Sequence, residues 1–233
     1  MGIALKKDFL FFFFLALQIL LWTHTKSIKP DMNVLPELQS EIAVKASSFG
    51  DEQFYFRTTG FEIQNAGDTF GRVTPLKDYD YSALEKWFFL LDSLDNESNF
   101  TPSMAAYYYS NTQYEPDLKY IVNYLDKHAD TNPSKKWWWY AQAVYNAQHK
   151  LGDKRRALDI AYKLAAVPAD VNMPLWARQL AAFIHEDLGE KEEALVIIRD
   201  ILENVDDIPE GELNFMHYFI KDRLDKIESN ELK

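Results

Sequence analysis

The sequence predicts an all-α domain of stacked antiparallel helical hairpins, behind one apolar helix at the N-terminus. Through most of the chain after residue 30, apolar residues recur at spacings of three and four, the periodicity of amphipathic helices. Only 8 glycines and 9 prolines occur in 233 residues, too few for a loop-rich or all-β chain. A segment that recurs after 37 residues indicates internal repetition. No stretch alternates polar and apolar residues for long enough to predict a sheet.

The composition excludes several classes of function. Because no cysteine is present, disulfide scaffolds, thiol catalysis, thiolate zinc sites and iron–sulfur clusters are ruled out. The formal net charge is −11, and it is −14 once residues 1–29 are set aside. A surface this acidic repels phosphate backbones, so we expect no nucleic acid among the partners.

The N-terminal apolar run is typical of a membrane segment. Residues 9–22 contain one polar residue, Gln18, and extension through Thr25 reaches the marginal length of a bilayer span. We expect a tail at 1–8, a single-pass transmembrane anchor at 9–25, a linker at 26–33 and a domain at 34–233. A cleaved signal peptide is the alternative, although Thr23-His24-Thr25 is a poor cleavage site. Two lysines flank the run on each side, so orientation rests on the default for a leading anchor, which exports the C-terminal domain to the periplasm or beyond the cytoplasm.

Ten helices are expected after the linker. Their ranges are 34–48, 51–66, 81–94, 102–111, 116–129, 134–151, 154–166, 173–188, 191–204 and 210–228. Two of the starts, Thr101-Pro102 and Asn132-Pro133, place a capping side chain before a proline, whose missing N–H costs nothing in the first turn of a helix.

The internal repeat predicts two consecutive helical hairpins. The segment Leu151–Leu158 recurs 37 residues later as Leu188–Leu195, and Trp139 and Trp176 have the same separation. In each copy a glycine supplies a left-handed turn between two helices. One hairpin cannot cover its own apolar face, so neighbouring hairpins must stack.

These residues resemble the tetratricopeptide-repeat (TPR) family, whose unit is two antiparallel helices with a Leu-Gly-acidic turn and an alanine shortly after it. The resemblance covers about residues 134–206, and the period of 37 exceeds the usual TPR length. In TPR proteins that grip peptides, first-helix residues line the concave face. The resemblance implies this role for Trp139, Gln142, Asn146, Trp176, Gln179 and Phe183. Asn146 matches the asparagine of sites that clamp a terminal carboxylate, whereas Gln142 replaces the accompanying lysine.

The connection at residues 66–80 is a second candidate site. It is the one long loop among closely connected helices, and ordered loops of this length are often functional. Its Asp68 and Arg72 are expected to make charge-assisted contacts to a partner protein. The alternative is that Asp68 and Arg72 fix the loop to the domain and that Asp80 caps the next helix.

Motifs for metal, cofactor or covalent chemistry are missing. The five histidines are scattered, and the sequence has no zinc-protease pattern, no glycine-rich phosphate loop and no serine nucleophile elbow. We therefore expect no metal, no cofactor and no catalytic residue.

Consecutive aromatic residues are the remaining signal, at 54–56, 87–89, 107–109 and 137–140. Three consecutive positions span about 200° of a helix, so at least one ring of each set leaves the core stripe. Such rings either fill contacts between hairpins or anchor another protein.

We expect a membrane-anchored TPR-like adaptor or scaffold that binds a protein in or near the membrane and helps assemble or stabilise an envelope complex. Two alternatives remain open. One is an enzyme-like helical solenoid that acts on an envelope polymer, with Asp68, Asp78 or Asp80 as the acid. The other is a structural subunit of a membrane complex, whose groove its own chain fills.

Overall fold

The computed structural model describes residues 2–26, 34–69, 71–168, 171–205 and 207–224, with the backbone alone at 2–8, 69, 72, 223 and 224. The chain divides into two compact units, Met1–Val34 and Leu35–Lys233.

The first unit contains helix α1 (Gly2–Thr25). The described side chains of its apolar run, from Phe9 to Trp22, are exposed. In the part of the chain that the structure describes, no helix combines the length and the apolar character needed to cross a bilayer. The expected transmembrane span at 9–25 is therefore not supported.

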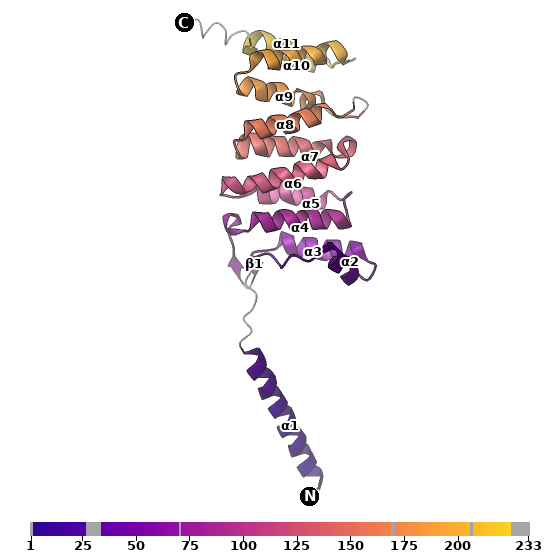
Figure 1. Ribbon diagram of the computed structural model, residues 1–233, viewed down its shortest axis with the longest axis vertical. Coiled ribbons are helices and arrows are strands. Elements are labelled where there is room, and N and C mark those ends of the chain that lie inside the picture. Colours follow the sequence, from indigo (N-terminus) through magenta and orange to yellow (C-terminus); the bar gives the residue numbers. More distant parts are fainter. Residues whose placement is uncertain (1, 27–33, 70, 169–170, 206, 225–233) are drawn as a thin grey trace. The chain divides into compact units, whose positions relative to one another are not determined.

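The second unit is a stack of helices, as the sequence predicts. Its first half contains α2 (Glu41–Ser47), α3 (Glu52–Gln64), β1 (Asp68–Thr69), β2 (Arg72–Val73), the 3₁₀ turn η1 (Leu76–Asp78) and α4 (Tyr81–Leu94). The second half contains α5 (Phe100–Ser103), η2 (Met104–Tyr108), η3 (Tyr109–Asn111), η4 (Glu115–Asp117), α6 (Leu118–Asp130), α7 (Pro133–Tyr145), η5 (Asn146–Lys150), α8 (Lys154–Ala165), α9 (Leu175–Asp187), α10 (Lys191–Asn204), α11 (Glu210–Tyr218) and η6 (Phe219–Leu224). Within this unit, the helices from α4 to α11 lie one beside the next (Figure 1).

The all-α class is confirmed, but in the first half of this unit one expected helix starts later and one small feature was not predicted. The helix expected at 34–48 begins only at Glu41, because Leu35 is buried and the carbonyl of Pro36 accepts a hydrogen bond from the Trp87 indole at 3.1 Å. The preceding segment is thereby held against α4. The expected all-helical chain also contains a small antiparallel hairpin, β1–β2, inside the 66–80 connection. Strands of two residues are too short to leave an alternating pattern in the sequence.

The expected turns between paired helices are confirmed. Gly152, with a φ of 73°, lies in the turn between η5 and α8. Gly189, with a φ of 81°, lies in the turn between α9 and α10. Alanines at the contacts are fully buried, including Ala143, Ala157 and Ala182. Side chains this small let neighbouring helices approach closely.

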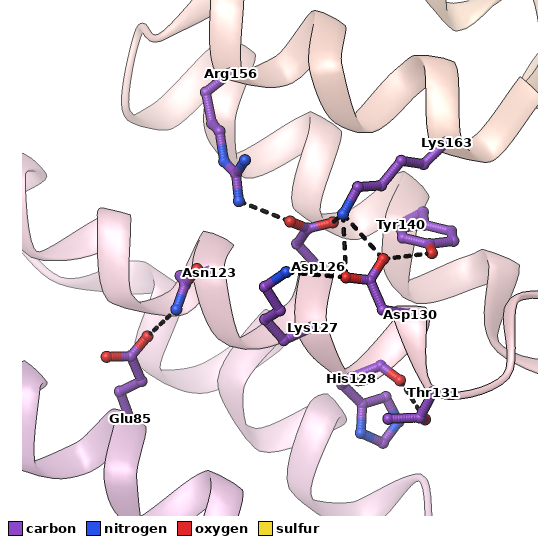
Figure 2. Close-up of polar contacts among 10 residues, drawn as sticks. All are labelled: Glu85, Asn123, Asp126, Lys127, His128, Asp130, Thr131, Tyr140, Arg156 and Lys163. Atoms are coloured by element: carbon purple, nitrogen blue, oxygen red, sulfur yellow. Dashed lines mark hydrogen bonds and ion pairs between the residues drawn. The ribbon is translucent and has the colours of Figure 1, made fainter.

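A polar cluster ties three helices of the stack together (Figure 2). The side chain of Asp126 in α6 is 1% exposed and accepts hydrogen bonds from Arg156 at 2.6 Å and Lys163 at 2.7 Å, both in α8. Lys163 also donates to Asp130 at 2.9 Å, and the Tyr140 hydroxyl of α7 donates to the same carboxylate at 2.8 Å. The cluster therefore fixes α6, α7 and α8 relative to one another.

The glycine turns yield a stability prediction. We expect Gly152→Ala and Gly189→Ala each to lower the free energy of unfolding by about 1–2 kcal/mol, because alanine is strained at positive φ. No atom lies within 4 Å of a Cβ at either position, so the loss measures backbone strain alone. Gly211→Ala, a helical position with equally open space, is the control and should be neutral or slightly stabilising. Urea denaturation compares the three, and equal losses at all of them would contradict the strain argument.

Asp130 makes stability depend on acid pH. Burial opposes its charge, but hydrogen bonds from Lys163, Tyr140 and Lys127 outweigh burial and hold its pKa below 3.8. A group whose pKa is lowered by folding contributes stability above its ordinary pKa and loses it as the pH falls through the folded value. The free energy of unfolding should therefore fall below about pH 4.

The control for this pH dependence is Tyr140→Phe, which keeps the ring and removes one hydrogen bond to Asp130. Urea titrations across acid pH should show a shallower dependence in Tyr140→Phe than in the unchanged protein. If the free energy of unfolding falls with pH equally steeply in both proteins, the pH dependence does not come from Asp130.

Candidate peptide-binding groove

Two adjoining hollows lie along α7, α9 and α11. We name the hollow between α7–η5 and α9 the α7–α9 hollow; it has a volume of about 170 Å³ and is lined by Ala141, Gln142, Val144, Tyr145, Gln148, His149, Trp176 and Leu180. We name the hollow between α9 and α11 the α9–α11 pocket; it has a volume of about 420 Å³ and is lined by Trp176, Gln179, Phe183, Pro209, Gly211, Glu212 and Phe215. Trp176 lines both, so the two hollows are neighbours, and we refer to them together as the groove.

Four of the expected concave-face residues line this groove. They are Gln142, Trp176, Gln179 and Phe183. The other two do not line it: Trp139 is 5% exposed and Asn146 is 1% exposed. Trp139 and Asn146 are therefore not part of this groove.

Trp139 and Asn146 belong to the interior of the stack. The Trp139 ring lies 6.3 Å from both His128 and Tyr107. Asn146 donates from Nδ2 to the carbonyl of Gln142 at 2.8 Å, and its buried Oδ1 has no hydrogen-bond partner. Asn146 lines neither hollow, so it is not placed to clamp a terminal carboxylate in the groove.

Aromatic rings from successive helices extend beside the groove. The Trp138 indole donates to the Tyr107 hydroxyl at 2.7 Å, and the Trp138 ring lies 6.4 Å from that of Trp176. At the other end, the rings of Phe183 and Phe215 are 5.8 Å apart. Together these rings connect η2, α7, α9 and α11.

Several residues in or beside the groove were missed from the sequence. Tyr107 and Trp138 were noted only as members of aromatic clusters. Which ring of a cluster is exposed depends on which other ring of the same cluster is buried in the core. In the cluster at 107–109, Tyr109 is the residue that lies in the core. It is fully buried, and its carbonyl accepts a hydrogen bond from the Tyr81 hydroxyl at 2.8 Å. Glu212 and Phe215 lie beyond the repeat, where no sequence pattern indicated a binding residue.

Gln179 is the most constrained polar group of the groove. It is 0% exposed; its Nε2 donates to Glu212 Oε2 at 3.2 Å, and its Oε1 has no hydrogen-bond partner. A buried carbonyl without a donor is energetically costly, and each such case requires an explanation. A ligand that donates a hydrogen bond to this carbonyl would explain why it lacks a partner.

The 66–80 connection is held by a residue that was not predicted. The Tyr79 hydroxyl donates to the carbonyl of Ala66, and burial raises the pKa of Tyr79 to about 12. Gly67, at a φ of 78°, leaves the space that this hydroxyl occupies. Asp68 is exposed, and the Arg72 side chain lies outside the described residues. Asp80 accepts from the Ala83 N–H at 3.0 Å, so its expected capping role is confirmed.

A carboxylate–imidazole–hydroxyl chain lies elsewhere in the stack. His185 Nδ1 is 2.7 Å from Glu190, and His185 Nε2 is 2.6 Å from the Tyr162 hydroxyl. Burial and the charges of Glu190 and Glu193 raise the pKa of Tyr162. A phenol held protonated in this way is not an activated nucleophile, so the chain serves to link α8 with the α9–α10 turn. Among the described residues, no group of three or more acidic or histidine side chains is placed to hold a metal ion.

Compared with known proteins, the chain matches no family model, no curated protein and no solved structure.

Proposed function

We propose that this protein is a TPR-like adaptor whose groove along α7, α9 and α11 binds an extended segment of a partner protein. The observation that carries the proposal is the double role of Trp176, which lines both the α7–α9 hollow and the α9–α11 pocket. A segment that spans the two hollows would contact the same large ring from both sides. Tryptophan at the centre of a concave patch is a typical interface hot spot.

The chemistry along the groove suits a peptide backbone. Trp176, Phe183 and Phe215 offer rigid apolar area at low cost in side-chain entropy. Gln142 lines the α7–α9 hollow, and Gln179, which lines the other, has a buried side-chain carbonyl without a hydrogen-bond partner among the described residues. Amide side chains both donate to and accept from backbone groups, and this makes them suitable for fixing the register of a peptide.

We further propose that α1 attaches the domain to a membrane, where the adaptor would help assemble or stabilise an envelope complex. The support is the exposed apolar run, which contains four consecutive phenylalanines at positions 11–14. Exposed apolar area of this extent marks an interaction surface.

The groove proposal predicts a position-specific cross-link. A photoreactive phenylalanine analogue at Tyr145, which is exposed and lines the α7–α9 hollow, should give a cross-linked adduct of defined mass in cells. Trp176→Ala should reduce its yield about tenfold, because the ring lost is shared by both hollows. Gel analysis and mass spectrometry of the adduct measure this.

The control places the same analogue at Phe54, an exposed aromatic residue of α3 outside the groove, and it should not give this adduct. Thermal melting of Trp176→Ala checks that the fold survives. The groove proposal fails if the adduct forms equally from Phe54, or if it persists in a folded Trp176→Ala variant.

Attachment through α1 is tested separately by flotation with phospholipid vesicles. The full chain should float with the vesicles, and replacement of Phe11–Phe14 by serine should abolish flotation, because about 2 kcal/mol of transfer free energy is lost with each buried ring. If the serine variant floats with the vesicles as well as the unchanged protein does, attachment through this run is refuted.

A further inference from the structure

The α9–α11 pocket combines aromatic walls with hydrogen-bond acceptors. Three of its lining residues present rings: Trp176, Phe183 and Phe215. Two others present oxygen acceptors, the Glu212 carboxylate and the Gln179 side-chain carbonyl. None of the residues that line it carries a positive charge.

Neither acceptor is neutralised by a basic side chain of the described residues. The Gln179 amide donates to Glu212 Oε2, and this contact brings no positive charge to the carboxylate. Arg178 lines the adjoining hollow on the other side of Glu212, but its guanidinium donates to the carbonyls of Ala165, Val167 and Pro168. The Arg178 guanidinium is therefore engaged elsewhere.

Aromatic faces beside a carboxylate favour a cation. The faces of tryptophan and phenylalanine rings carry negative potential, which attracts an ammonium or guanidinium group. The carboxylate adds direct charge attraction, and Gln179 Oε1 adds an acceptor for an N–H donor. A neutral aliphatic side chain would fill the volume but leave both acceptors unpaired.

We propose that the α9–α11 pocket binds a lysine or arginine side chain of the partner segment, with the stem against the rings and the charged head at Glu212 and Gln179. This rests on the proposed peptide-binding function and names the chemistry that the partner must bring. The volume of about 420 Å³ lies within the range of small-ligand pockets. The net charge of −11 favours the approach of a basic segment.

The test uses the full chain in detergent micelles with small probes in place of the partner. N-acetyl-lysine amide and N-acetyl-arginine amide supply the cation, and N-acetyl-norleucine amide is the uncharged counterpart of the lysine probe. NMR titration follows the Trp176 indole N–H and the Gln179 side-chain amide. We expect saturable shifts with both cationic probes and binding at least about tenfold weaker with norleucine.

Two variants separate charge from fold. Glu212→Gln keeps the shape of the side chain and should weaken lysine binding about tenfold, while Glu210→Gln, on the same helix but outside the pocket lining, should leave it unchanged. Equal binding of norleucine and lysine, equal effects of the two variants, or no shift with either cationic probe would overturn the assignment.

The outcome is distinguishable from that of the groove proposal. If the cross-link from position 145 depends on Trp176 but the cationic probes do not bind, the adaptor function stands and the cation assignment is wrong. If the probes bind and the cross-link is absent, the pocket is a cation site without a peptide groove.

Discussion

The buried carboxylate of Asp126 is the constraint on which the arrangement of the groove depends. It is shared by Arg156 and Lys163, so α6 and α8, the second helices of neighbouring hairpins, are held at a fixed separation. The helix α7 lies between them in sequence and packs against both. A buried ion pair contributes little net stability, because desolvation cancels much of the attraction. The pairing of Asp126 with two basic side chains of α8 favours one register of α8 against α6.

Local signals explain how much of the fold could be read from the sequence. The helices Tyr81–Leu94 and Lys191–Asn204 have the predicted bounds, because periodicity and turn residues act within a few positions. The predicted start of α2 was wrong because the carbonyl of Pro36 accepts a hydrogen bond from Trp87, which is 51 residues away in the sequence. The Asp126 cluster was invisible for the same reason: nothing along the chain indicates which lysine will face which aspartate.

The candidate site shows what a resemblance can and cannot carry. It identified α7 and α9 as the helices that line the groove, and four of six residues lie there. It failed at Trp139, which is buried in the stack and lines neither hollow. Equal spacing in the sequence made Trp139 and Trp176 equivalent, yet one is buried and the other lines both hollows. The orientation of each helix about its own axis is set by its neighbours.

Two first helices of the stack share one further property: α5 continues into the π turn η2 and α7 into the π turn η5, whereas α9 is α-helical throughout. At η5 the N–H of Leu151 reaches back five residues to the carbonyl of Asn146 at 2.9 Å. A turn of this kind holds one residue more than an α-helical turn. At η5 an inserted residue can therefore be accommodated at the C-terminal end of the first helix, so a hairpin can lengthen by one residue without displacing the next one.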